Sequence, residues 1–147
     1  MILAIDPGQS GGIAWMDDDG VVNCADMLPT AGDIIDHLRM LKAAGREITA
    51  YLEKTGGYVP GNSGPAACKF ARGCGLLEGA IMALAIPLVE VAPGVWMKTL
   101  GSLPSDKRAR KNAIKGLMQA RYPHLKITLS TADALGLLTY ALEKRAS

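Results

Sequence analysis

The sequence lacks a long hydrophobic run. Its longest apolar stretch, residues 79–89, is too short to span a bilayer and is broken by Pro87. The chain also opens directly on an apolar segment, without the basic region that begins a secretory signal peptide. We therefore expect neither a membrane-spanning segment nor a membrane partner.

Cysteine is scarce as well. Cys24, Cys68 and Cys74 lack the spacing of a metal-binding motif, and an odd number fits poorly with the disulfide framework of a small secreted protein. A cytoplasmic location is the expectation that follows. With 147 residues, of which 49% are hydrophobic, the chain is expected to form a single domain, residues 1–147, with a substantial core.

The net charge of +2 is small but unevenly distributed along the chain. Residues 1–50 hold three basic and eight acidic side chains, a net charge of −5, whereas residues 98–147 hold ten basic and three acidic ones, a net charge of +7. Such asymmetry favours a polyanionic partner for the basic part. A basic helix face exposed to solvent would give the same pattern.

The hydrophobic pattern predicts strands alternating with helices. Short apolar runs bounded by Gly and Pro predict strands at residues 1–5, 13–16, 21–27, 48–53 and 86–91. Apolar residues at helical spacing predict a helix from Pro29-Thr30 to Gly45, then helices at residues 65–85, 105–121 and 131–144, with a short helical segment near 96–98. The acidic triplet at residues 17–19 is expected to form a hairpin turn rather than a metal site, and His37 is expected on the surface.

Two of the expected strands end on a carboxylate. Asp6 stands between the first apolar run and the turn at Pro7-Gly8, and Glu53 ends the strand at residues 48–53. Ligands and metals gather at the carboxyl ends of strands in open α/β sheets. A buried carboxylate there must be hydrogen-bonded, paired or bound to a cation, because its desolvation is costly. The alternative for Asp6 is that its side chain only caps the turn.

A third carboxylate, Asp133, stands at the expected start of the last helix. The run Ser130-Thr131-Ala132-Asp133 matches a capping box, which would give Asp133 a purely structural role. If this helix instead packs against Asp6 and Glu53, the three acids repel one another unless a cation is shared. Oxygen ligands favour Mg²⁺ or Mn²⁺, and two such ions about 4 Å apart support in-line attack on a phosphodiester. With a basic C-terminal part, nucleic acid is the simplest anionic substrate.

A series of short motifs extends along most of the chain. In order, these are Ile2–Gly8 with Gly11–Ala14, Tyr51–Glu53, Ala71–Gly73, Ile81–Leu84, Val91–Pro93, the Lys98 segment, Ser105–Lys107 and Ala132–Leu135. Their order resembles that of the RuvC-type Holliday junction resolvases. The resemblance implies an α/β, ribonuclease H-like three-layer fold, with a mixed five-stranded sheet flanked by helices.

The same resemblance implies a set of metal ligands. The metal-binding acids of the family fall on Asp6, Glu53 and Asp133, which would hold two Mg²⁺ ions per active site, with Mn²⁺ able to substitute. The family carries a further acid or histidine three residues before the last Asp, where this chain has Ser130. That serine is well placed to cap the last helix instead, and His124 is a distant candidate for the missing ligand.

The resemblance also implies residues that contact DNA. Lys98 and Lys107 match basic positions near the scissile phosphate, where they would neutralise charge in the transition state; Lys107 is therefore counted with the three acids as catalytic. Tyr58 is the nearest equivalent of an aromatic residue that stacks on junction bases. The basic helix is expected to contact backbone phosphates through Lys107, Arg108, Arg110, Lys111 and Lys115.

The function implied is that of a Mg²⁺-dependent endonuclease that resolves four-way junctions in branched DNA by paired nicks. A homodimer suits such a substrate, since a twofold junction needs two symmetric cuts. Three alternatives stay open: a ribonuclease H-fold nuclease acting on RNA and similar to YqgF, a phosphate-binding module of the actin and sugar-kinase type, and a catalytically weakened junction-binding protein. The second is disfavoured because 147 residues leave no second domain to close over a nucleotide; the third gains support from Ser130.

Overall fold

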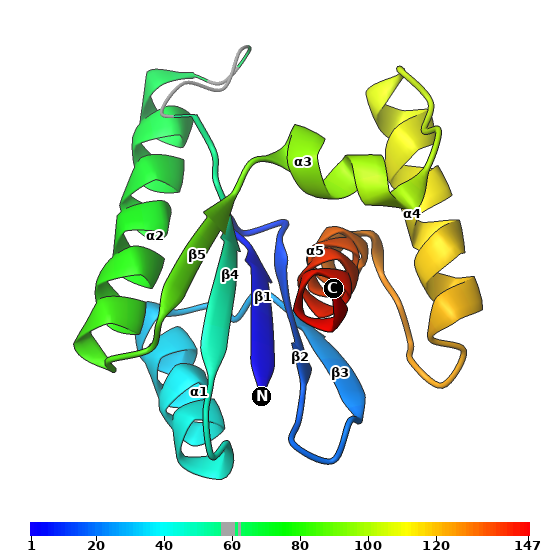
Figure 1. Cartoon of the computed structure of the whole chain (residues 1–147). Coiled ribbons are helices and arrows are strands. Elements are labelled where there is room, and N and C mark those ends of the chain that lie inside the picture. Colours follow the sequence, from blue (N-terminus) through cyan, green and yellow to red (C-terminus); the bar gives the residue numbers. More distant parts are fainter. Residues whose placement is uncertain (57–60, 62) are drawn as a thin grey trace.

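A mixed five-stranded sheet forms the centre of the computed structural model, which describes residues 1–56, 61 and 63–147. Its strands are β1 (Ile2–Asp6), β2 (Gly12–Met16), β3 (Val22–Asp26), β4 (Thr49–Glu53) and β5 (Leu88–Val91). They lie side by side in the order β3-β2-β1-β4-β5 (Figure 1). β1 pairs antiparallel with β2 and parallel with β4, and β5 is parallel to β4. The five expected strands are thus confirmed.

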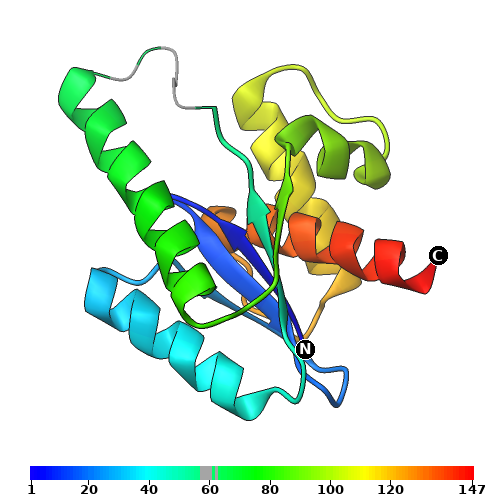
Figure 2. The same ribbon diagram turned by 60° about the vertical axis from the view of Figure 1, so that its left-hand side comes forward.

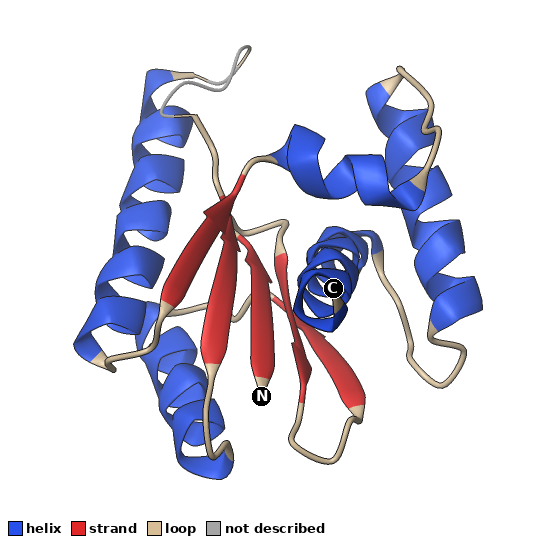
Figure 3. Ribbon diagram, viewed as in Figure 1, coloured by secondary structure: helices blue, strands red, loops and turns tan. Residues whose placement is uncertain are grey.

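Helices cover both faces of this sheet. They are α1 (Ala31–Ala44), α2 (Gly64–Ala83), α3 (Pro93–Met97), α4 (Lys107–Arg121) and α5 (Leu129–Ala146), with a 3₁₀ turn at Lys98–Leu100. Figures 1 and 3 show α1 and α2 on one side of the strands and α4 and α5 on the other, and Figure 2 shows the same layers after rotation. The predicted three-layer α/β fold, with a mixed five-stranded sheet flanked by helices, is therefore confirmed. No helix within the described residues is both long and apolar enough to cross a membrane.

The alternation of side chains along a strand divides the core into two halves. In β1, Ile2 and Ala4 pack in the cluster formed with α4 and α5, whereas Leu3 and Ile5 pack in the cluster formed with α1 and α2. Because successive residues of a strand point to opposite faces, Asp6 continues the Ile2–Ala4 side and faces α5. The acid that ends β1 is thus directed toward the C-terminal helices.

The last helix begins two residues earlier than the sequence predicts, and its cap differs. The Oγ1 atom of Thr128 accepts a hydrogen bond from the backbone N–H of Thr131 at 3.1 Å, and the Oγ1 atom of Thr131 accepts one from the backbone N–H of Thr128 at 3.0 Å. This reciprocal pair is a capping box. The predicted caps at Ser130 and Asp133 are therefore wrong, because both residues lie inside the helix.

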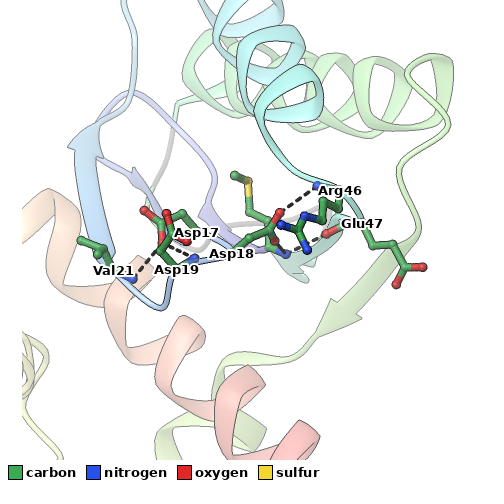
Figure 4. Close-up of polar contacts among 7 residues, drawn as sticks. Asp17, Asp18, Asp19, Val21, Arg46 and Glu47 are labelled. Carbon is green, nitrogen blue, oxygen red and sulfur yellow. Dashed lines mark hydrogen bonds and ion pairs between the residues drawn. The ribbon is translucent and has the colours of Figure 1, made fainter.

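The acidic triplet of the β2–β3 hairpin has a structural role (Figure 4). Asp17 accepts hydrogen bonds from two backbone N–H groups of the turn, at 3.0 and 2.8 Å. Asp18 accepts one from the backbone N–H of Arg46 at 2.8 Å and forms an ion pair with the amino group of Met1 at 2.6 Å. The hydrogen bond from this amino group lowers the pKa of Asp18. The predicted turn is confirmed.

His37 of α1, which the sequence predicts on the surface, is only partly exposed. Its ring packs edge-on against Trp15 of β2, with 5.1 Å between ring centroids. Its Nε2 atom is buried, without a hydrogen-bond partner in the described part of the chain, and burial lowers the pKa of this imidazole. The aromatic pair therefore holds one side of His37 against the sheet, and the residue is only partly exposed.

Candidate active site

A cleft of about 440 Å³ opens at the carboxyl ends of β1 and β4, between the β1–β2 turn and the helices α4 and α5. Asp6, Glu53 and Asp133 all line it, as do the basic residues Lys107, Arg110 and Lys111. We call it the carboxylate cleft. Acids from three distant segments of the chain thus share one cavity with three cationic side chains of α4.

The sheet register places the first two acids side by side. Ile5 of β1 is the pairing partner of Leu52 in the parallel strand β4, so Asp6 and Glu53 are the next residues along neighbouring strands. In β4, Ala50 and Leu52 pack toward α1 and α2, whereas Tyr51 packs toward α5. Glu53 continues the Tyr51 side by the same alternation, so it reaches the same face of the sheet as Asp6.

Two glycines bring Asp133 to these strand ends. A Cβ atom on Gly11 would collide with the backbone oxygen of Asp6, so the β1–β2 turn requires glycine there. A Cβ atom on Gly12 would lie 2.5 Å from the backbone oxygen of Ser130. Glycine at this position therefore lets the first turn of α5 approach β2 closely, and Asp133 follows one turn later.

The β1–β2 turn does not depend on the Asp6 side chain. It is closed by a hydrogen bond from the backbone N–H of Gly11 to the backbone oxygen of Gly8 at 3.1 Å. Within the described residues, no hydrogen bond to the carboxylate of Asp6 is present. The alternative that Asp6 serves as a turn cap is therefore wrong, and its carboxylate remains available to the cleft.

Glu53 is held by a tryptophan that the sequence analysis placed only in a short helical segment. The Nε1 atom of Trp96, which is fully buried at the end of α3, donates a hydrogen bond to Oε2 of Glu53 at 2.8 Å. Gly136 of α5 makes room for the indole, because a Cβ atom there would lie 2.5 Å from the ring. A glycine in the middle of a helix that also carries a candidate ligand was the available sequence signal for this contact.

Asp133 is the only buried side chain among the Asp, Glu, Lys and Arg residues that the structure describes. Its side chain is 12% exposed, and its Oδ2 atom forms an ion pair with Nζ of Lys111 at 3.3 Å. Its Oδ1 atom is buried and has no hydrogen-bond partner in the described part of the chain. One oxygen of this carboxylate therefore still lacks the partner that burial demands.

The three acids influence one another electrostatically. Burial, followed by the negative charges of Glu53 and Asp133, raises the pKa of Asp6 from 3.8 to about 8, although the Lys111 charge acts in the opposite direction. Burial also raises the pKa of Glu53, with a further contribution from Asp133, whereas the Trp96 hydrogen bond and Lys111 oppose the rise. Such perturbed pairs of carboxylates are typical of functional sites.

The donor set fits a hard divalent cation, because it consists of carboxylate oxygens with one oxygen of Asp133 still unpartnered. The three carboxylates do not form a complete coordination shell in this structure. Across residues 1–56, 61 and 63–147, no three His, Cys, Asp or Glu side chains converge closely enough to hold a metal ion as they stand. That Asp6, Glu53 and Asp133 bind metal therefore stays a prediction.

The structure separates the predicted basic residues. Lys107, Arg110 and Lys111 line the carboxylate cleft, whereas Lys98 and Lys115 are not among its lining residues. Arg108 instead lines a neighbouring groove between α4 and the start of α5, together with Lys107 and Lys111. The Nη1 atom of Arg110 also donates a hydrogen bond to the backbone oxygen of Ser105 at 2.7 Å, which ties α4 to the preceding loop.

The two remaining predicted residues have different outcomes. His124, the distant candidate for a missing ligand, has its Nε2 atom 3.1 Å from the backbone oxygen of Val22 in β3 and does not line the cleft. Tyr58, the predicted stacking residue, lies outside the described residues. Phe70 of α2 is an aromatic residue at the cleft that sequence reasoning missed.

Comparison with solved structures shows that the fold of this chain is similar to that of Holliday junction resolvases. No family model matches the sequence, and no curated protein matches it. A structure of T. thermophilus RuvC in complex with Holliday junction substrate matches over 99% of this chain and 96% of its own, with a TM-score of 0.62 at 18% identity. A second Thermus thermophilus RuvC structure covers 99% and 95%, with a TM-score of 0.54 at 20% identity.

A viral enzyme shares the same fold. The Fowlpox virus resolvase, in complex with substrate Holliday junction DNA, matches over 98% of this chain and 99% of its own, with a TM-score of 0.54 at 11% identity. At these identities the similarity establishes architecture alone. The chain has a RuvC-like resolvase fold, which is a ribonuclease H-like α/β fold.

Proposed function

We propose that this protein is a divalent-metal-dependent endonuclease that hydrolyses phosphodiesters in branched DNA, with four-way junctions as its substrate. The observation that carries the proposal is the carboxylate cleft itself, in which Asp6, Glu53 and Asp133 face cationic side chains of α4. Carboxylates suit a hard cation, and cations suit a phosphate. A cavity with both groups suits phosphodiester hydrolysis.

Each group has a distinct role in this proposal. Asp6, Glu53 and Asp133 would hold Mg²⁺ or Mn²⁺, and Trp96 would orient Glu53 through its hydrogen bond. A bound divalent cation supplies Lewis acidity and neutralises charge on the scissile phosphate. Lys107 and Arg110, which line the same cleft, would attract the phosphate and stabilise the charge that develops on its oxygens.

The branched substrate is supported by the fold rather than by the cleft. Solved structures with this fold include RuvC and a poxvirus resolvase, both in complex with Holliday junction DNA. A cleft of carboxylates and cations alone would suit other nucleic acids, including RNA. This chain matches 96% of the RuvC chain and 99% of the poxvirus resolvase chain, and this near-complete match favours the junction as substrate.

A homodimer follows from the same proposal. A four-way junction has twofold symmetry, and two identical active sites related by a twofold axis would make symmetric nicks. Light scattering after size exclusion, with and without junction DNA, measures this state. A complex with one protein chain per junction would contradict it.

The direct test compares substrates. A labelled four-way junction, a matching linear duplex, a splayed arm and an RNA hairpin are incubated with the protein, each with and without Mg²⁺. We expect metal-dependent paired nicks in the junction and much slower cleavage of the other three. Preferential cleavage of the RNA would instead indicate a ribonuclease, and cleavage that persists in EDTA would contradict the metal requirement.

A second candidate, junction binding without efficient cleavage, is supported by a specific observation. Ser130 stands where a fourth ligand is expected, and the three acids do not converge into a ready-made metal group within the described residues. Mg²⁺ demands near-ideal octahedral geometry, so incubation with Mg²⁺ and with Mn²⁺ separates the two candidates. Tight junction binding with no cleavage in either metal would favour the binding protein.

A further inference from the structure

The ion pair between Lys111 and Asp133 places a protein cation among the three acids. The Nζ atom of Lys111 lies 3.3 Å from Oδ2 of Asp133. Both residues line the carboxylate cleft with Asp6 and Glu53. The positive charge of Lys111 also stabilises the ionised forms of Asp6 and Glu53. One ammonium group thus partly neutralises a site that carries three carboxyl groups.

The packing of α4 fixes the position of this lysine. Ile114 and Met118 of α4 are buried in the core cluster between α4 and α5. Asp133 lies on α5. The side chain of Lys111 is accordingly only 35% exposed. Lys107 and Lys115, one turn to either side, form no ion pair within the part of the chain that the structure describes. The contact with Asp133 therefore distinguishes Lys111 from the other lysines of its helix.

We propose that Lys111 is the internal counter-ion of the metal-free cleft, and that a divalent cation gains Asp133 only by displacing its ammonium group. The inference rests on the proposed metal-dependent function, because it assumes that Asp133 is a ligand. Two cations at one carboxylate repel each other strongly in a partly buried site. Lys111 therefore lowers metal affinity while it stabilises the metal-free fold.

Displacement would give the lysine a second position. Once released from Asp133, its ammonium group remains attached to α4 at the wall of the same cleft, where a substrate phosphate would lie. Metal binding would thus free a phosphate contact, and the phosphate would in turn favour the displaced lysine. Lys111 is in this sense a positioning residue, acting on the metal site through Asp133.

The test measures Mn²⁺ affinity of the DNA-free protein by electron paramagnetic resonance, so that catalysis does not enter the readout. Lys111→Met removes the charge but keeps much of the side-chain volume, and Lys115→Met removes the same charge one turn further along α4. We expect Lys111→Met to bind Mn²⁺ about tenfold more tightly than the unchanged protein. Lys115→Met should stay within about twofold, because its charge has no ion pair at the cleft.

Folding is measured in parallel. Loss of Lys111 leaves Asp133 buried without its partner, so the thermal midpoint of Lys111→Met should fall in EDTA and rise with Mn²⁺ by more than that of the unchanged protein. Lys111→Gln, which keeps a hydrogen-bond donor for Asp133, is measured beside it and should also bind Mn²⁺ more tightly. Lys111→Gln allows the same comparison if Lys111→Met does not fold.

The outcomes separate the two proposals. Unchanged or weaker Mn²⁺ affinity in the folded Lys111 variants would overturn the displacement and leave the proposed metal-dependent function intact. Equal gains in Lys111→Met and Lys115→Met would also overturn it, because general electrostatics would then explain the effect. No Mn²⁺ binding by any of the proteins would overturn the metal site, and both proposals with it.

Discussion

The indole of Trp96 donates a hydrogen bond to Glu53 at 2.8 Å from a position that Gly136 leaves open. Glu53 ends β4, Trp96 lies at the end of α3, and Gly136 belongs to α5, one turn beyond Asp133. The orientation of one candidate ligand therefore depends on the helix that carries another. A change in the packing of α5 should affect both.

Substitution of Trp96 by Phe tests the hydrogen bond while keeping a large buried ring. A hydrogen bond to a charged group contributes about 1.5–3 kcal/mol, and Glu53 would lose a contact that opposes the rise of its pKa. We expect the rate of junction cleavage at neutral pH to fall about tenfold or more. The optimum should move to higher pH. A rate equal to that of the unchanged protein would show that Trp96 is needed for packing alone.

Substitution of Gly136 by Ala tests the space beneath the indole. Overpacking of a core costs about 1–3 kcal/mol, so the free energy of unfolding should fall by that amount in urea denaturation. The matched control is Gly116→Ala in α4, where a Cβ atom meets nothing within 4 Å. There the higher helix propensity of Ala should add up to about 1 kcal/mol. Equal effects at the two positions would contradict the packing argument.

The three acids are tested one at a time by Asp6→Asn, Glu53→Gln and Asp133→Asn. Each change removes a carboxylate ligand and also reduces the repulsion of phosphate, so cleavage should be lost while junction binding persists or becomes tighter. Asp36→Asn, at a surface acid of α1 paired with Arg39, is the control and should cleave normally. Near-normal cleavage by Asp133→Asn would show that Asp133 has no role in the site.

The raised pKa of Asp6 predicts how stability changes with pH in the metal-free protein. Folding raises this pKa from 3.8 to about 8, so the folded state holds a proton that the unfolded state loses. Its stabilising contribution is therefore complete below pH 3.8 and is lost as the pH rises through about 8. Asp6→Asn should show a shallower loss of stability over this range, measured by urea unfolding in EDTA. An identical slope in the two proteins would contradict the raised pKa.

Metal binding should respond to pH in the opposite direction. Because a ligand must lose its proton to bind a cation, the affinity for Mn²⁺ should increase as the pH rises toward about 8, where Asp6 ionises. Calorimetry in buffers of different ionisation enthalpy should detect the released proton. An affinity that does not change with pH would indicate that Asp6 is already ionised.

The salt dependence of junction binding tests the basic side of α4. Each phosphate neutralised contributes about −0.9 to the slope of log affinity against log salt. Removing two contacts in Lys107→Ala/Arg108→Ala should therefore flatten the slope by roughly two units. The control Lys42→Ala/Lys144→Ala removes the same charge from α1 and α5, outside the cleft. Binding is measured in EDTA to prevent cleavage, and an unchanged slope in the first variant would indicate that α4 does not contact phosphate.

Local sequence signals were sufficient for most of the fold. The runs that became β1 and β4 are short, apolar and bounded by turns, and each ends on the acid that lines the cleft. Asp6 and Glu53 could therefore be placed at one sheet edge before the register was known. The position of Asp133 at the same edge could not be predicted from local signals. It depends on the close approach of α5 to β2 at Gly12, between segments that are far apart in the chain.

The contacts that refine the site could not be predicted from spacing. Trp96 meets Glu53, and Lys111 meets Asp133, across 43 and 22 positions of sequence respectively. The basic pattern of α4 was evident, but which lysine faces an acid depends on how α4 packs on α5. The predicted cap at Ser130 was wrong for a local reason. Residues 128–131 and residues 130–133 both fit a helix start, and the reciprocal hydrogen bonds of Thr128 and Thr131 select the earlier one.

Ser130 does not cap α5, so substitutions at this position can test whether the cleft accepts a fourth carboxylate. Thr128 is the cap of α5, so Thr128→Ala should lower the free energy of unfolding by about 1 kcal/mol, whereas Ser130→Ala should change it little. Ser130 stands three residues before Asp133, so the two side chains lie on neighbouring positions of one helix face. Ser130→Asp should therefore supply a further carboxylate near the cleft.

We expect Ser130→Asp to cleave junctions at a lower Mg²⁺ concentration than the unchanged protein, and Ser130→Ala to need the same concentration. A new negative charge near Asp133 also adds repulsion in the metal-free state, so Ser130→Asp should be less stable in EDTA and recover with Mg²⁺. A titration of cleavage rate and of thermal midpoint against Mg²⁺ measures both effects. A higher Mg²⁺ requirement in Ser130→Asp would mean that the site does not accept a fourth acid, and that Asp6, Glu53 and Asp133 hold the metal without one.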